Sequence, residues 1–275
     1  KGMGKAKAFH QTASRNVGVV IDQLGDRPLN DYSTVDAGKV RDALINRGLS
    51  VISVRRIFTT VKAVINLAIA EHGLDIRNAF AAIYMPEAES KKRVSIPVET
   101  IRQIQQSCLE HDDDMRWLIA LISDTGMRLA EAAGLHVDDI KLDEDIPYVD
   151  IKPHPWRSLK TKGSQRQVPL VGASLWAAHR IRANASSCFA FPRYTDNTRC
   201  NANSASNALN KWLHANFRKD IVIHGFRHAM RDRLRAVSCP SEMIDQIGGW
   251  SSGKVGEGYG EGFDLRSVVN CLEQI

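Results

Sequence analysis

A chain of 275 residues, 43% of them hydrophobic, is long enough to bury one large or two modest cores, which excludes an intrinsically disordered protein. It has no run of 18 apolar residues, so we expect no membrane span, and five cysteines without a Cys-x-x-Cys pair argue against a zinc site or a disulfide framework and for reduced thiols in a cytoplasm. The net charge of +6 comes from residues 1–96, which hold 15 Lys and Arg against 9 Asp and Glu. This surplus suits binding to a polyanion such as nucleic acid, but on charge alone it is equally explained as charge that keeps the protein soluble.

The first third of the chain is predicted to be helical. Residues 7–24 carry apolar side chains at loose helical spacing. A second helix is expected over 35–47, where Ser33-Thr34 offers an N-cap. A third helix is expected to open at Ser50, to run to about His72 and to stop at Gly73.

The third predicted helix has two distinct faces. One is an apolar stripe that suits a core, formed by Ile57, Val61, Val64, Ile65, Ala68 and Ile69. Arg55, Thr59 and Lys62 follow one another at i, i+4 and i+7 on another face, and we call these three residues the basic stripe. A basic stripe opposite a core suits a helix laid against phosphates, and the alternative is a solvated face.

Residues 85–96 are predicted to be a linker between a helical domain, 1–84, and a second domain, 97–275. Apolar periodicity is lost here between two prolines, and the segment is highly charged. Lys91, Lys92 and Arg93 form a linker cluster of positive charge, for which a solvated linker is one interpretation.

The second domain is predicted to mix helices with a small antiparallel sheet, so that the whole chain is mainly α. Short alternating segments bounded by polar turn residues indicate strands at 148–151 and 166–170. Helical spacing predicts segments at 98–109, 114–122 and 131–135, helices that open near Ser174, Ser204, Phe226 and Ser241, and an amphipathic tail helix within 263–275.

Four separated segments of this domain carry side chains suited to phosphodiester chemistry. Arg128 lies in Asp-Thr-Gly-Met-Arg-Leu-Ala-Glu, and the His-Gly-Phe-Arg motif places His224 and Arg227 at 96 and 99 residues beyond it. Trp250 follows, and Tyr259 comes nine residues after Trp250. Arginine binds two phosphate oxygens at once and keeps its proton, while a phenol can attack phosphorus.

These motifs resemble the tyrosine recombinase (phage integrase) family, over nearly the whole chain and most strongly from residue 97 to 260. The resemblance implies a helical core-type DNA-binding domain followed by a mixed α/β catalytic domain. It also implies a site-specific recombinase that cuts and rejoins DNA through a 3′-phosphotyrosyl intermediate.

The resemblance implies a role for each side chain. Tyr259 is the nucleophile, and the scissile phosphate is contacted by Arg128, Arg227, His224 and Trp250. A lysine before the Val-Pro-Leu segment protonates the leaving 5′-oxygen; Lys160 is preferred, and Lys162 is the alternative. Glu131 orients Arg128, unless it is an ordinary glutamate of a helix surface. The basic stripe and the linker cluster would contact DNA.

The expected partners are double-stranded DNA, further copies of the chain that form a tetramer on paired sites, and accessory DNA-bending or directionality proteins. No cofactor or metal is expected, since the run Asp112-Asp113-Asp114 lacks the ligand spacing of a calcium loop and suits a helix N-terminus. The resemblance places the protein in a bacterial cytoplasm, at the nucleoid, encoded by the bacterium or by a phage or other mobile element. The alternatives are a type IB topoisomerase-like nicking-closing enzyme and a DNA-binding protein without catalysis.

Overall fold

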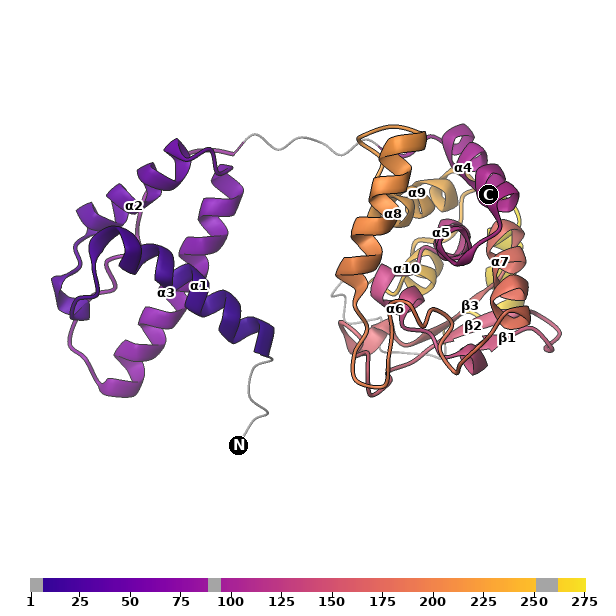
Figure 1. The fold of residues 1–275 in the computed structure, drawn as a ribbon, viewed down its shortest axis with the longest axis horizontal. Coiled ribbons are helices and arrows are strands. Elements are labelled where there is room, and N and C mark those ends of the chain that lie inside the picture. The colour runs from indigo at the N-terminus through magenta and orange to yellow at the C-terminus, as the bar shows by residue number, and fades with distance from the viewer. Residues whose placement is uncertain (1–6, 89–94, 251–261) are drawn as a thin grey trace. The chain divides into compact units, whose positions relative to one another are not determined.

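The chain forms two compact units, residues 1–92 and 93–275 (Figure 1). The computed structural model describes residues 7–88, 95–250 and 262–275. The fold is mainly helical with one small antiparallel sheet, as the sequence predicts.

The described part of the N-terminal unit has three α-helices: α1 (Lys7–Leu24), α2 (Thr34–Asn46) and α3 (Val51–His72). The side chain of Ser33 accepts from the backbone N–H of Asp36, whose carboxylate accepts from Ser33 in return, so a capping box starts α2. Ser50 caps α3, and Gly73, at φ 57°, ends it in the left-handed conformation that glycine adopts without strain. The predicted starts and stop of these helices are confirmed.

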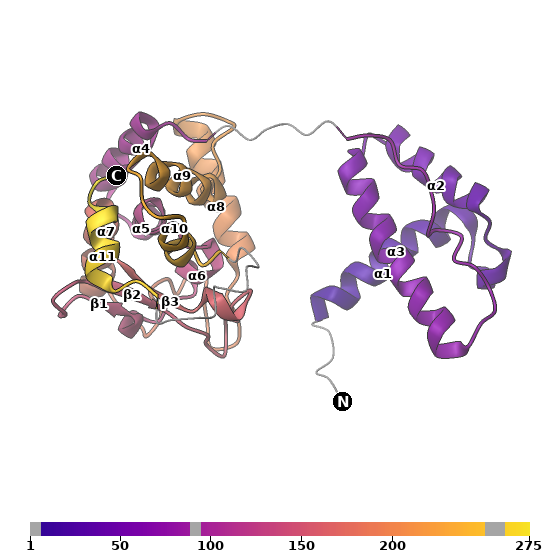
Figure 2. The same ribbon diagram turned by 180° about the vertical axis from the view of Figure 1, so that it is seen from behind.

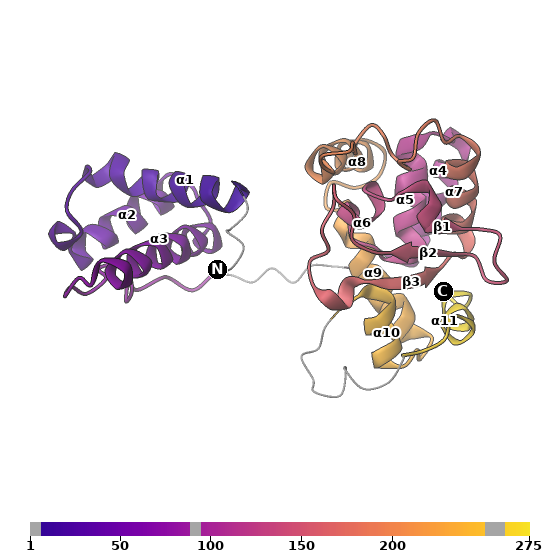
Figure 3. The ribbon, with the colours of Figure 1, turned by 90° about the horizontal axis from the view of Figure 1, so that it is seen from below.

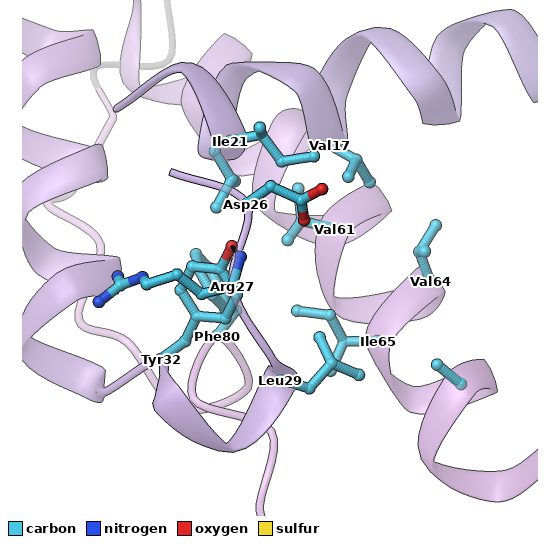
Figure 4. A pocket seen from close by; sticks show the side chains of 12 residues that line it. Val17, Ile21, Asp26, Arg27, Leu29, Tyr32, Val61, Val64, Ile65 and Phe80 are labelled. Atoms are coloured by element: carbon cyan, nitrogen blue, oxygen red, sulfur yellow. Dashed lines mark hydrogen bonds between the residues drawn. The ribbon is translucent and has the colours of Figure 1, made fainter. Parts of the chain in front are cut away.

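The core of this unit lies where α1, α2 and α3 meet. Val54, Phe58 and Val61 of α3 are buried there together with Phe80. The basic stripe lies on the exposed part of α3. An apolar hollow of about 120 Å³ lies between parts of α1 and α3, lined mainly by valine, isoleucine and leucine side chains beside Tyr32 (Figure 4).

The first residues of the predicted linker belong to the N-terminal unit, and its last residue belongs to the second unit. Arg41 Nη1 donates to the Tyr84 carbonyl, at 2.8 Å, and Arg55 Nη2 to the Pro86 carbonyl, at 3.0 Å. Ile96 is 7% exposed and packs in the core of the second unit. The linker cluster lies outside the described residues.

Helix α5 (Asp114–Thr125) is the central element of the second unit, and its last eight residues are buried. It packs against α4 (Val98–His111), α7 (Gly172–Ala183) and α9 (Ile223–Ala236), which surround it in Figure 1. The other α-helices in the described part of this unit are α6 (Leu129–Ala133), α8 (Ala202–Asn216), α10 (Ser241–Gly248) and α11 (Leu265–Leu272).

The acidic run at 112–114 connects α4 to α5. Asp112 ends α4 in the left-handed conformation, and its carboxylate accepts from Trp117 Nε1 at 2.7 Å. Asp113 caps α5 by accepting from the backbone N–H of Arg116. The run therefore starts a helix, as its sequence suggests.

The sheet has the order β1 (Ile140–Lys141), β2 (Tyr148–Ile151) and β3 (Arg166–Pro169), and both pairings are antiparallel. The sequence predicts β2 and β3 but not β1, whose two residues are too few for alternation. Val149 lies opposite Val168, and both are buried. Helices α10 and α11 pack against β3 (Figure 3).

The tail helix α11 packs on its own unit. Val268, Val269 and Leu272 are its buried residues, which follow the predicted apolar spacing. Figure 2 shows α11 on the near face of the unit, and Leu272 and Ile275 share a hollow with Gly172 and Leu175.

Four helix starts lie two or three residues before the predicted ones. Helix α6 begins at Leu129, whereas the sequence predicted a start at residue 131. Helices α7 and α8 begin at residues 172 and 202, because Ser174 and Ser204 are the third residues of their helices rather than caps. The Asn201 side chain caps α8 by accepting from the backbone N–H of Ser204. Helix α9 begins at Ile223, so His224 lies inside its first turn.

Candidate active site

Arg128 lies at the N-terminus of α6, directly after the turn that ends α5. Its Nη1 donates to Glu131 Oε1 at 2.6 Å and to Ser164 Oγ at 3.1 Å, and its Nη2 donates to the Gly249 carbonyl at 2.9 Å. The side chain is 22% exposed. Three parts of the chain therefore hold this guanidinium at the edge of the protein interior.

Glu131 is buried, with 3% exposure, so it is not an ordinary glutamate of a helix surface. Its Oε2 accepts from the Arg128 backbone N–H and from Arg166 Nη2, each at 3.0 Å. Burial raises the pKa of this carboxyl, but Arg166 and then Arg128 more than reverse that effect and leave it below its ordinary value. Glu131 is thus an anion that orients Arg128.

Arg227 lies on the inner face of α9 and is 3% exposed. Its Nη1 donates to the Gly126 carbonyl, at 2.8 Å, at the C-terminal end of α5, where carbonyls favour a cation. Its Nη2 is buried and makes no hydrogen bond to the described residues. Burial, and after it the charges of Arg128 and Arg166, lower the pKa of Arg227 to about 9.

The ring of Trp250 lies against two arginines of α9. Its ring centroid is 4.4 Å from the guanidinium carbon of Arg227 and 5.0 Å from that of Arg231. Two glycines make this possible. A Cβ on Gly248 would lie 1.9 Å from the indole ring, and one on Gly249, at φ 57°, would lie 2.7 Å from Arg166 Nη1. We call Arg128, Arg227 and Trp250 the clamp.

His224 lies three residues before Arg227 in the first turn of α9. It is exposed, and its ring centroid is 4.9 Å from that of His228. A spacing of i, i+3 places two side chains on neighbouring parts of a helix surface. His224 therefore lies on a part of the α9 surface that neighbours Arg227.

Lys160 lies in the connection between β2 and β3 and is exposed. Four residues later Ser164, which accepts from Arg128, also contacts Thr161 Oγ1 at 2.9 Å. Lys160 is thus four residues before Ser164, whose hydroxyl contacts Arg128 of the clamp. Lys162 begins the short turn 162–164, and its side chain lies outside the described part of the chain.

The same connection is anchored by an aromatic stack that sequence reasoning missed. The ring of Trp156 stacks on His154, with centroids 4.6 Å apart, and meets Phe189 edge-on at 4.9 Å. Trp156 Nε1 donates to the Gly134 carbonyl at 2.9 Å. His154 Nε2 lies 2.6 Å from a carboxylate oxygen of Asp139, which is 1% exposed.

Arg166 and Ser164 are further site residues that the sequence did not reveal. One signal for Arg166 was present: in the alternation of β3 it shares the buried face with Val168. An arginine at such an inward position needs a buried partner, which is Glu131.

The structure thus brings Arg128, Glu131, Arg227 and Trp250 together, with His224 beside them. Tyr259 lies outside the described residues, and the basic stripe belongs to the other unit. Within the described ranges, no three His, Cys, Asp or Glu side chains gather to hold a metal ion. No described helix has the length and apolar character to cross a bilayer.

The model of the phage integrase family matches residues 95–261, more than half of the chain. The chain therefore belongs to the phage integrase family, the tyrosine recombinases. Two relatives are named tyrosine recombinase XerC, from Neisseria meningitidis serogroups C and B, and each is 26% identical over 193 residues. The match covers 67% of this chain and about 60% of either relative.

Solved integrases share the fold of this chain. The Tn1549 transposon integrase, in complex with circular intermediate DNA, matches with a TM-score of 0.70 and 16% identity over 97% of this chain and 94% of that one. A lambda integrase dimer bound to a COC′ core site matches with a TM-score of 0.68 and 16% identity, over 99% and 91%.

Proposed function

We propose that this chain is a site-specific DNA recombinase of the integrase type, which cuts and rejoins strands through a 3′-phosphotyrosyl intermediate. The clamp supports this proposal most directly. Arg128 offers a partly exposed guanidinium, and Arg227 offers a buried N–H without a partner among the described residues. Such a pair suits the two non-bridging oxygens of a phosphodiester.

In the proposed reaction the phenol oxygen of Tyr259 attacks the phosphorus, and the bond from phosphorus to the 5′-oxygen breaks. The phenol loses its proton with help from His224, and Lys160 gives a proton to the departing 5′-oxygen. Negative charge on the equatorial oxygens is met by the clamp. Attack by a 5′-hydroxyl of a partner strand then reverses the step and releases Tyr259.

The partners that we propose are suggested by the solved structures of related integrases. The solved relatives include an integrase with transposon right end DNA and a lambda integrase tetramer on a Holliday junction. For this chain we propose double-stranded DNA, contacted also by the basic stripe and the linker cluster, and a tetramer on paired sites. We further propose that the protein acts at the nucleoid in a cytoplasm, that accessory proteins assist it, and that a mobile element encodes it.

Covalent trapping tests the proposed activity. Fragmented bacterial genomic DNA is incubated with the protein, the mixture is denatured, and DNA that remains attached is sequenced. The expected result is a recurring sequence attached through its 3′ phosphate, and none with Tyr259→Phe, which still binds duplex DNA. Attachment without a recurring sequence would favour a topoisomerase-like enzyme, and no attachment at all would refute the proposal.

A further inference from the structure

Arg166, at the start of β3, is one of the most deeply placed charges of the catalytic unit. Its side chain is 4% exposed. The guanidinium donates from Nη2 to Glu131 Oε2 at 3.0 Å, from Nη1 to the Ser164 carbonyl at 2.7 Å, and from Nε to the Ile247 carbonyl at 2.7 Å. One side chain therefore ties β3 to α6, to the end of the β2–β3 connection and to the end of α10.

The groups that Arg166 holds are the supports of Arg128. Glu131 accepts from both arginines through different oxygens. Ser164 accepts from Arg166 through its carbonyl and from Arg128 through its hydroxyl. Gly249, whose carbonyl accepts from Arg128, lies against the Arg166 guanidinium. Arg166 thus fixes, from the buried side, each group that Arg128 contacts from the exposed side.

The charges of this cluster matter as much as its geometry. Two guanidiniums share the single carboxylate of Glu131, so the trio keeps one net positive charge. Without Arg166, the Arg128–Glu131 pair would be neutral and would attract a phosphate much less strongly. Since Arg166 is the more deeply buried of the two, the uncompensated charge is available on the Arg128 side.

We propose that Arg166 is a positioning residue of the phosphate clamp, which holds the supports of Arg128 and leaves the Arg128 charge free for the scissile phosphate. This inference rests on the proposed recombinase function. Arg166 touches no reacting atom in it and acts only through Arg128.

Lysine cannot take over this task, although it keeps the charge. Its ammonium is one point on a flexible stem, whereas the planar guanidinium reaches three acceptors in different directions. Burial lowers the pKa of Arg166, and the carboxylate of Glu131 counters that effect. The ion pair with Glu131 therefore keeps the Arg166 guanidinium charged.

A change at the substrate distinguishes a clamp residue from a residue that only supports the fold. The duplex carries the site recovered by covalent trapping, with the scissile position either as a normal phosphate or as a neutral methylphosphonate. Formation of the covalent adduct is followed in a single turnover. We expect Arg166→Lys to slow it about 100-fold on the phosphate, the usual cost of displacing a catalytic group by an ångström. On the methylphosphonate, which carries no charge for the clamp to meet, the variant should approach the wild-type rate.

Two reference variants frame the result. Arg128→Ala should show the same restoration on the methylphosphonate. Arg233→Lys is the matched control, since Arg233 is also buried, donates to the Ser123 carbonyl at 2.9 Å and pairs with Asp124 at 3.0 Å. Neither of these partners is among the supports of Arg128. The rates of this control on the two substrates should therefore change by the same factor.

Equal slowing of Arg166→Lys on both substrates, or no slowing, would overturn the proposal. Tryptophan fluorescence checks that each variant is folded. If Arg166→Lys does not fold, Arg166→Gln, which keeps a hydrogen-bond donor without the charge, is put through the same comparison, and the same outcomes support or overturn the proposal. A wild-type protein that forms no adduct on either substrate refutes the recombinase function and this proposal with it, whereas an active wild type isolates the role of Arg166.

Discussion

The guanidinium of Arg227 lies over the indole ring of Trp250, 4.4 Å from its centroid. This contact contributes about 1 kcal/mol, whereas the burial of an ion that has no carboxylate partner, as Arg227 has none among the described residues, costs several kcal/mol. A bound anion would therefore stabilise the buried charge of Arg227. Residues of this kind are placed for function at the expense of stability.

We predict that Arg227→Met raises the free energy of unfolding of the catalytic unit by about 1 kcal/mol and abolishes DNA cleavage, because methionine fills similar space without a desolvated charge. Denaturant titration followed by tryptophan fluorescence measures this. All five tryptophans lie between residues 117 and 250, so the signal reports the second unit alone. Arg233→Met, which removes the charge partner of the buried Asp124, should instead lower the free energy of unfolding by about 3–5 kcal/mol.

The same substitution gives a pH prediction. Because the pKa of Arg227 falls to about 9 in the folded protein and keeps its ordinary, higher value in the unfolded chain, the unfolded state binds more protons above pH 9. Wild-type stability should then rise with pH relative to Arg227→Met, so the advantage of the variant shrinks between pH 9 and 11 and is constant between pH 6 and 8. An advantage that is the same at pH 7 and pH 10.5 would contradict a depressed pKa.

Gly249→Ala should slow cleavage by about 10-fold or more, because a Cβ 2.7 Å from Arg166 Nη1 forces apart a guanidinium and a carbonyl that fix Arg128. Its backbone alone, at φ 57°, costs about 1–2 kcal/mol with alanine. Gly73→Ala is the control, since Gly73 has the same φ and open space around it. Cleavage rates that fall equally in both variants would assign the effect to backbone strain.

The parts of the fold that local chemistry determines could be predicted from the sequence. Ser33 and Ser50 start helices, and Gly73 ends one. The predicted apolar stripe of α3 is only partly correct, because Val61 is its one fully buried member and the unpredicted Val54 and Phe58 complete the buried face. The clamp arginines could also be found, because the motif around Arg128 and the His-x-x-Arg motif place guanidiniums at helix ends.

The remainder depends on contacts between distant segments. Arg166 could not be assigned, since an arginine is usually exposed and its partner Glu131 lies 35 residues away. The position of Trp250 depends on the missing side chain of Gly248, which sequence spacing does not reveal. The strand β1 exists only by pairing with β2.

The basic stripe allows a test of DNA contact in the N-terminal unit. If Arg55 and Lys62 each meet a phosphate, replacement of either by alanine should reduce the slope of log affinity against log salt by about one. Lys39 of α2 is the matched control, because it is exposed and pairs with Asp36. Duplex binding is measured by fluorescence anisotropy at several salt concentrations. Unchanged slopes for both Arg55→Ala and Lys62→Ala would show that the basic stripe is a solvated face that does not contact DNA phosphates.

The choice between Lys160 and Lys162 as the general acid can be settled at the leaving group. We expect Lys160→Ala to slow cleavage about 100-fold or more, the usual contribution of a positioned proton donor, and Lys162→Ala to slow it far less. A substrate with sulfur in place of the bridging 5′-oxygen leaves as a thiolate and needs no proton. It should therefore restore Lys160→Ala to near the wild-type rate and leave Tyr259→Phe inactive. Restoration of Lys162→Ala but not of Lys160→Ala would move the role of the acid to Lys162, two residues closer to the Ser164 hydroxyl that accepts from Arg128.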